Sequence, residues 1–120
     1  MKKILVADDE AALRMLIVDS ILDLGFEVDE AENGKEALEK IQNNDYALII
    51  LDYMMPNMTG IEVLDCLADE KKRNSTILML TAKVQDKDQQ LALQAGVNYF
   101  ITKPFSPIEL CNFVEETLHD

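Results

Sequence analysis

Short, almost wholly apolar runs alternate along the chain with longer segments in which apolar residues recur at helical spacing. One such segment lies between Ala11 and Leu24, and Gly25 follows it as a typical helix stop. The apolar runs suit strands that are buried on both faces of a parallel sheet. We therefore predict five strands, at residues 4–7, 26–30, 47–51, 77–80 and 99–101, of which the second alternates polar and apolar positions.

A helix is predicted after each strand. Three of these helices begin with a capping box, in which a side chain at the helix start and a glutamate three positions later bond each other's backbone. The fourth helix can be capped by Asp86 and ended by Gly96, and the fifth runs nearly to the end of the chain. The boxes pair Asn33 with Glu36 for a helix to about residue 42, Thr59 with Glu62 for a helix to about residue 70, and Ser106 with Glu109, where Pro107 takes the first helical position.

Strict alternation of strands and helices predicts one compact α/β domain over residues 1–120, with a parallel sheet covered by helices on both faces. On the last helix we expect Ile108, Cys111 and Leu118 to face the core. Leu110 and Phe113 fall off this stripe, so they could form either an exposed apolar patch for a partner or a second core face.

Composition excludes several classes of protein. Hydrophobic residues make up 48% of the chain, yet no apolar run approaches the roughly 20 residues that cross a bilayer, so we expect no membrane association. The first apolar run is too short for a signal peptide and ends in three acids, which favours a cytoplasmic protein. The net charge of −12 opposes direct contact with nucleic acid. The two cysteines lack metal-ligand spacing, and the single histidine, His119, lies beside the C-terminus.

Polar side chains follow four of the predicted strands. Asp8 and Asp9 follow the first strand, Asp52 the third, Thr81 the fourth and Lys103 the fifth. Ligands of open α/β sheets bind at the carboxyl ends of the strands, so we expect these side chains to lie together. Each of them alone also suits a helix cap, a turn or a strand end. Their joint occurrence at four strand ends favours a functional site.

Three neighbouring carboxylates repel one another, and a bound cation relieves that repulsion. Oxygen ligands with water completing the shell suit Mg²⁺, and the lack of thiolate and imidazole at this edge argues against zinc or copper. Asp52 could then act as a nucleophile that forms an acyl phosphate. The cation and Lys103 would neutralise charge on the phosphoryl oxygens, to which Thr81 could donate a hydrogen bond.

Over its whole length the chain resembles the receiver domains of two-component response regulators, in particular those like the chemotaxis regulators. The motifs agree with the family in order and in spacing. The matching stretches are residues 4–10 (ILVADDE), 31–38 (AENGKEAL), 51–56 (LDYMMP), 58–60 (MTG), 80–82 (LTA), 95–96 (AG) and 102–105 (TKPF).

The resemblance implies a flavodoxin-like, three-layer α/β/α fold, in which a doubly wound, five-stranded parallel sheet has the order 2-1-3-4-5 and is flanked by five helices. It makes Asp52 the phosphoacceptor. It also implies a Mg²⁺ ion, which Mn²⁺ could replace, held by Asp9 directly, by Asp8 through water, by Asp52 and by the backbone carbonyl of Met54.

The resemblance further assigns Thr81 and Lys103 to the phosphoryl group, and it implies a cis peptide bond between Lys103 and Pro104. Phe100 matches the switch aromatic of the family. A phosphoryl group on Asp52 would draw Thr81 toward it, and Phe100 would fill the vacated space. The surface of the fourth helix, fifth strand and fifth helix would then change through a population shift. Simple core packing is the alternative role of Phe100.

The implied donor is a sensor histidine kinase, a phosphotransfer protein or a small phosphodonor, and the implied recipient of the signal is an effector domain or protein. Lys83 and Met54 are expected to help set the phosphoryl lifetime. A homodimer linked to phosphorylation is a further expectation. Receivers that dimerise on winged-helix transcription factors usually carry GADDY where residues 96–100 read GVNYF, and basic residues where the last helix has Glu115 and Glu116. We therefore do not expect their salt-bridged dimer.

Three other functions are alternatives. An aspartate-nucleophile phosphohydrolase usually needs a second acid two residues after the nucleophile, where this chain has Met54, so we do not expect an enzyme that turns over substrates. A phosphorylation-independent, receiver-like binding module tends to lose the acidic pair, the acceptor or the lysine, all of which are present. A flavin-binding domain would want a phosphate loop rich in serine, threonine and glycine where three acids stand.

Overall fold

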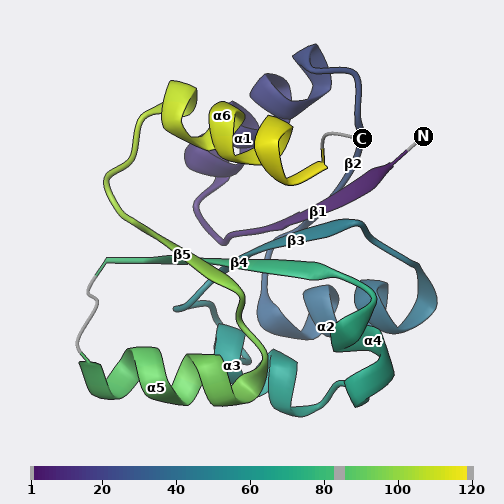
Figure 1. Cartoon of the computed structure of the whole chain (residues 1–120), viewed down its shortest axis with the longest axis vertical. Coiled ribbons are helices and arrows are strands. Elements are labelled where there is room, and N and C mark those ends of the chain that lie inside the picture. Colours follow the sequence, from purple (N-terminus) through teal and green to yellow (C-terminus); the bar gives the residue numbers. More distant parts are fainter. Residues whose placement is uncertain (1, 83–85, 119–120) are drawn as a thin grey trace.

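The structure, a computed structural model, describes residues 2–82 and 86–118. Its centre is a sheet of five parallel strands in the order β2-β1-β3-β4-β5 (Figure 1). This is the order that the resemblance implied, so the predicted doubly wound fold is confirmed. The strands are β1 (Lys3–Ala7), β2 (Glu27–Ala31), β3 (Leu48–Asp52), β4 (Thr76–Thr81) and β5 (Tyr99–Thr102).

Helices cover both faces of the sheet (Figure 1). One face carries α1 (Ala11–Asp23) and α6 (Pro107–Leu118), which pack against each other. The other face carries α2 (Gly34–Asn43), α3 (Gly60–Asp65), α4 (Asp69–Arg73) and α5 (Asp86–Ala95). None of these helices, over the residues described, is long and apolar enough to span a membrane.

The core lies on both sides of the sheet because successive residues of a strand point to opposite faces. Ile50 packs in the cluster that includes residues of α1 and α6, while Leu51 packs in the cluster that includes residues of α2, α3 and α5. The register places Ala7 beside Leu51 and Asp52 beside Leu80. The residues that follow β1, β3, β4 and β5 therefore meet at one edge of the sheet.

The predicted helix starts are largely confirmed. Thr59 and the glutamate three positions later form the complete capping box of α3. The side chains of Asn33 and Ser106 accept hydrogen bonds from backbone N–H groups at the starts of α2 and α6. Helix α5 begins at Asp86 and ends directly before Gly96, as predicted for its end. Asp86 is the predicted cap of this helix, and its side chain lies outside the part of the chain that the structure describes.

The predicted extent of the third helix is wrong. The sequence pattern favours one helix from residue 60 to about 70, but α3 ends at Asp65 and the separate, short α4 begins at Asp69. The turn between them places Leu67 in the core, and Ala68 takes an extended backbone with φ −65° and ψ 148°. The acids at the start of α4 then complement the positive end of its dipole. The described chain therefore has six helices rather than five.

The predicted core stripe of the last helix is also wrong. Leu110 and Leu118 are buried, whereas Ile108 is 73% exposed and Cys111 is only half-buried. Leu110 follows Ile108 by two positions and so points about 200° away around the helix, which prevents both from facing the core. Phe113 packs partly against the same core. Of the two alternatives for Leu110 and Phe113, the second core face is the correct one.

Candidate functional site

Three carboxylates meet at the carboxyl edge of the sheet. Asp8 follows β1 and is fully buried, Asp52 ends β3 and is 5% exposed, and Asp9 is exposed. One oxygen of each acid lies within 4.8 Å of the others. The structure thus brings together the three acids that the sequence predicted to meet. In the part of the chain that the structure describes, no other group of three acids, histidines or cysteines could hold a metal ion.

An ammonium group lies between two of these acids. Lys103 Nζ is 3.2 Å from Asp8 Oδ2 and 3.2 Å from Asp52 Oδ2. The peptide bond between Lys103 and Pro104 is cis, the isomer that the resemblance implied. The backbone N–H of Lys103 donates to the carbonyl of Thr81 at 2.8 Å, so the segment after β5 is fixed to the end of β4.

Burial and the neighbouring charge of Asp8 raise the pKa of Asp52 to about 6, although the Lys103 ammonium and the backbone N–H of Met54 partly offset this rise. Burial alone would lower the pKa of Lys103, but the two carboxylates outweigh burial and raise it. Lys103 therefore stays charged at neutral pH. Three acids and one ammonium leave the site with an excess of negative charge, which a further cation would relieve.

The donor set fits a hard divalent cation. All three candidate ligands are carboxylate oxygens, the kind of ligand that Mg²⁺ and Mn²⁺ prefer. Asp8 Oδ1 accepts the backbone N–H of Glu10 at 2.9 Å, and its Oδ2 accepts the ammonium of Lys103 at 3.2 Å. Because both oxygens already have partners, Asp8 suits contact with a cation through water. The exposed Asp9 suits direct contact.

The loop that joins β3 to α3 begins directly after Asp52, and backbone hydrogen bonds hold it in place. The N–H of Tyr53 donates to the carbonyl of Leu80 at 2.9 Å, and the N–H of Gly60 donates to the carbonyl of Tyr53 at 2.8 Å. A Cβ at Gly60 would lie 2.7 Å from the Asp52 carbonyl oxygen, so this close approach requires glycine. Met54 donates its backbone N–H to Asp52 and exposes its side chain. Ligation of a metal by the Met54 carbonyl stays a prediction.

Thr81 and Phe100 lie on neighbouring strands. Thr81 is the buried last residue of β4, and Phe100 lies on β5 opposite Met79. Phe100 packs partly buried against the cluster under α2, α3 and α5, so core packing accounts for its position. The roles of Thr81 at the phosphoryl group and of Phe100 as a switch stay predictions. Lys83 lies outside the described residues.

A pocket of about 420 Å³ opens beside Lys103. Its walls come from the start of α1, from the end of β4 and from the segment that follows β5. The pocket therefore borders the acidic site through Lys103. Its lining residues are Glu10, Leu13, Ala82, Lys103, Pro104 and Phe105.

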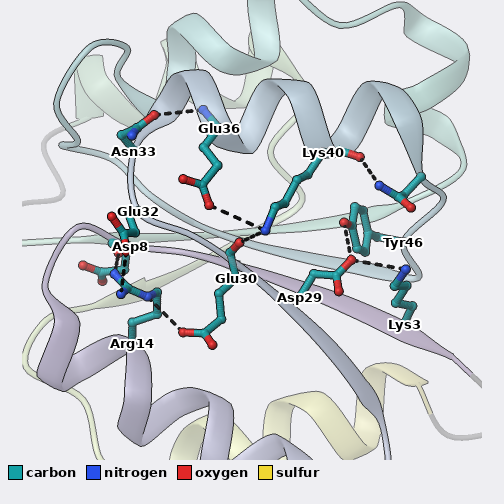
Figure 2. Close-up of polar contacts among 11 residues, drawn as sticks. Lys3, Asp8, Arg14, Asp29, Glu30, Glu32, Asn33, Glu36, Lys40 and Tyr46 are labelled. Atoms are coloured by element: carbon teal, nitrogen blue, oxygen red, sulfur yellow. Dashed lines mark hydrogen bonds and ion pairs between the residues drawn. The ribbon is translucent and has the colours of Figure 1, made fainter.

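Sequence reasoning missed Arg14, whose guanidinium reaches the backbone of the acidic site. Figure 2 shows it between Asp8, Glu30 and Glu32. A signal was available, because Arg14 precedes the buried Ile17 of α1 by three positions and so lies on the inward side of the helix. A cation in such a position is rarely buried without a partner.

The chain is similar to known proteins over most of its length. Residues 4–115 match the family model of the response regulator receiver domain. The transcriptional regulatory protein ResD of Bacillus subtilis is 44% identical over 108 residues, which are 90% of this chain and 44% of that protein. The chain therefore spans less than half the length of the curated relatives it matches.

Two solved structures illustrate the likeness of fold. The chemotaxis response regulator CheY4 of Vibrio cholerae has a TM-score of 0.90 at 33% identity, and the match covers 98% of this chain and 99% of that one. The response regulator protein TrrA of Thermotoga maritima, solved in complex with Mg²⁺-BeF, has a TM-score of 0.84 at 36% identity. That match covers 98% of this chain and 100% of TrrA.

Proposed function

Because this chain belongs to the response regulator receiver domain family, we propose that it is a phosphoacceptor switch that takes a phosphoryl group on Asp52. Such a domain is a signalling module of two-component transduction rather than a conventional enzyme. The observation that carries the proposal is the cluster of Asp8, Asp9 and Asp52 with Lys103 3.2 Å from two of its acids.

In the proposed transfer, a carboxylate oxygen of Asp52 attacks the phosphorus of the donor, the bond between phosphorus and the donor breaks, and an acyl phosphate forms. A pKa of about 6 leaves Asp52 ionised at neutral pH, as a nucleophile must be. Lys103 would neutralise charge on the phosphoryl oxygens. Thr81, at the end of the next strand, would donate a hydrogen bond to one of them. Slow loss of the phosphoryl group would reset the switch.

We propose a divalent cation, Mg²⁺ or Mn²⁺, at the three acids. Asp9 would hold it directly, Asp8 through water, and Asp52 and the Met54 carbonyl would complete the protein ligands. When bound, the cation would supply positive charge that offsets the repulsion between the phosphoryl oxygens and the acids. The all-carboxylate donor set supports this assignment, and so does the solved complex of TrrA with Mg²⁺-BeF.

The donor would be a phosphohistidine on a sensor histidine kinase or a phosphotransfer protein of the cytoplasm. Such a donor would approach the acceptor through the pocket beside Lys103, whose ammonium is 3.2 Å from Asp52 Oδ2. On α1, which contributes to that pocket, Met15 and Leu16 expose apolar side chains that a protein partner could cover. The net charge of −12 opposes contact of this domain with nucleic acid.

The output would be a population shift of the surface made by α5, β5 and α6, which are the fourth helix, fifth strand and fifth helix of the sequence prediction. Thr81 ends β4 next to β5, and Phe100 lies on β5, so the two connect the acceptor with this surface. An effector domain, an effector protein or a second copy of the chain would bind there. The large apolar side chains exposed on these elements are Leu91, Leu93, Tyr99 and Ile108.

Intact mass after incubation with acetyl phosphate tests the proposal. We expect the wild type to gain one phosphoryl group in the presence of Mg²⁺ and none without it. Asp52→Asn should gain none, because the nucleophile is gone. Asp45→Asn is the matched control: its side chain is 92% exposed and pairs only with a surface lysine among the ion pairs seen, so it should be labelled like the wild type.

Two outcomes would contradict the proposal. Labelling of Asp52→Asn at the level of the wild type would place the acceptor elsewhere. A wild type that neither gains a phosphoryl group nor binds Mg²⁺ in a calorimetric titration would favour a phosphorylation-independent binding module instead.

A further inference from the structure

Arg14 is a nearly buried cation beside the acidic site, and its side chain is 11% exposed (Figure 2). Its Nη1 donates to the backbone carbonyl of Asp8 at 2.7 Å, and its Nε donates to Glu30 Oε1 at 3.0 Å. Its Nη2 lies 3.7 Å from Glu32 Oε1. No step of the proposed transfer uses this side chain, so its position needs another explanation.

The carbonyl that Arg14 holds belongs to the peptide that joins Asp8 to Asp9. The side chain of Asp8 is fixed separately, by the N–H of Glu10 at 2.9 Å and by Lys103 at 3.2 Å. Asp9 is exposed, and the direction of its carboxylate depends on the plane of the preceding peptide. The hydrogen bond from Arg14 fixes that plane.

We infer that Arg14 is a positioning residue for the metal: by holding the peptide between Asp8 and Asp9, it directs the Asp9 carboxylate toward the oxygens of Asp8 and Asp52 before a cation binds. The inference rests on the proposed function, since it requires a divalent cation at these acids. Preorganised ligands bind more tightly because they lose less freedom on binding. Mutation of a group that orients a metal ligand without contacting the metal commonly lowers the metal affinity about 10- to 100-fold.

The guanidinium is itself held in one orientation. Glu30 belongs to β2 and Glu32 follows that strand, so both acceptors come from the edge of the sheet (Figure 2). Lys40 of α2 donates to the backbone carbonyl of Glu30 and fixes the strand at this point. A planar guanidinium has N–H donors that can point at three such acceptors at once, whereas an ammonium lacks this planar arrangement of donors. Arg14 therefore connects the backbone at Asp8 with the edge of the sheet that β2 forms.

Removal of the Arg14 charge and loss of its positioning role would change the affinity for Mg²⁺ in opposite directions. The direction of the measured change therefore distinguishes the two effects. Removal of a positive charge near three carboxylates would strengthen the binding of Mg²⁺, because less repulsion opposes the incoming cation. Loss of the hydrogen bond to Asp8 would weaken binding, because Asp9 would have to be ordered by the metal. Arg14→Lys keeps the positive charge but loses the planar set of N–H donors. If only the charge mattered, the affinity of this variant for Mg²⁺ would equal that of the wild type.

The experiment is a calorimetric titration of the full chain with Mg²⁺. We expect the dissociation constant to rise about 10-fold in Arg14→Met and by a smaller factor in Arg14→Lys. Lys3→Met is the matched control, since it removes the same charge from an ion pair with Asp29 at the far end of β1; its affinity should equal that of the wild type or be slightly tighter. Circular dichroism without metal verifies that each variant is folded.

A second readout separates positioning from general damage. The Mg²⁺ concentration that half-saturates labelling by acetyl phosphate should rise with the dissociation constant, while the maximal rate at saturating Mg²⁺ stays within about twofold of the wild type. Unchanged or tighter binding in Arg14→Met would overturn the inference. If Arg14→Met does not fold, Arg14→Lys decides, and an affinity equal to the wild type overturns the inference there. A wild type that binds no Mg²⁺ refutes the proposed metal site instead.

Discussion

Asp52 is the residue at which burial, charge and chemistry conflict most directly. Burial and Asp8 raise its pKa to about 6 from an ordinary value of 3.8, with Lys103 acting in the other direction. The carboxylate is ionised at neutral pH, but the ionised form is less stable in the folded chain than in the unfolded chain. The residue that we propose as the acceptor therefore lowers the stability of the fold.

We expect Asp52→Asn to raise the free energy of unfolding at pH 7, without metal, by on the order of 1–2 kcal/mol. Between the ordinary pKa of 3.8 and about 6, the folded chain holds a proton on Asp52 that the unfolded chain has lost. The destabilisation is thus complete above pH 6 and disappears as the pH falls toward 4. Urea unfolding at pH 7 and about pH 4.5 measures this, and the advantage of the variant should shrink at the lower pH. An equal advantage at both values would contradict the raised pKa.

The acids, the threonine and the lysine could be predicted to meet because each ends or follows a strand, and parallel strands end at one edge of their sheet. Residue chemistry alone predicts a nucleophile at Asp52, a neutralising ammonium at Lys103 and a hydrogen-bond donor at Thr81. The family resemblance adds the separate contacts of Asp8 and Asp9 with the cation. Arg14 shows where this reasoning stops. Its inward position on α1 is visible in the sequence pattern, but its partners are not, since Glu30 lies 16 residues away and meets it only through the packing of α1 beside β2.

Among the elements, the contact of α2 with the loop between β3 and α3 bears most directly on the site. Gly34, the first residue of α2, donates its N–H to the carbonyl of Pro56 at 3.3 Å. A Cβ at Gly34 would lie 2.2 Å from the Met58 carbonyl oxygen and 2.6 Å from Met58 Cβ. Backbone atoms cannot yield as the end of a flexible side chain does, so the loop behind Asp52 would have to move.

We therefore expect Gly34→Ala to lower the free energy of unfolding by about 1–3 kcal/mol, although alanine normally favours a helix. Labelling by acetyl phosphate should also slow, because the displaced loop carries Met54, whose N–H donates to Asp52. Gly25→Ala is the control. Gly25 has a φ of 93°, but no atom lies within 4 Å of its Cβ position. The free energy of unfolding of Gly25→Ala should therefore fall by about 1–2 kcal/mol, while its labelling rate should equal that of the wild type. Equal labelling of both variants would exclude a role of the α2 contact in the site.

The elements also show which features a sequence pattern determines. Apolar runs and capping boxes predicted the strands and most helix starts, because both depend on residues close together in the sequence. The break between α3 and α4 depends on the burial of Leu67 in the tertiary core, which no local signal indicates. The phase of α6 was mistaken because Ile108 and Leu110 both suit a buried stripe, and only packing on the sheet selects Leu110.

For the whole molecule, the net charge of −12 gives Mg²⁺ two ways to stabilise the fold. Repulsion among like charges destabilises the compact chain, and any added salt screens that repulsion. Binding at Asp8, Asp9 and Asp52 would add a specific contribution, because these acids come together only in the folded state. A comparison of Mg²⁺ with Na⁺ at equal ionic strength separates the two effects.

We expect millimolar MgCl₂ to raise the melting temperature of the wild type more than NaCl of the same ionic strength does. At a concentration about one hundred times the dissociation constant, binding adds about 2.7 kcal/mol, which is several degrees for a chain of this size. Asp52→Asn should keep the response to NaCl and lose most of the additional response to Mg²⁺, since it lacks one ligand and one of the repelling charges. Differential scanning calorimetry measures both. Equal shifts in the two salts for the wild type would mean that the acids hold no cation, and the acceptor would then face the phosphoryl oxygens with Lys103 as its paired cation.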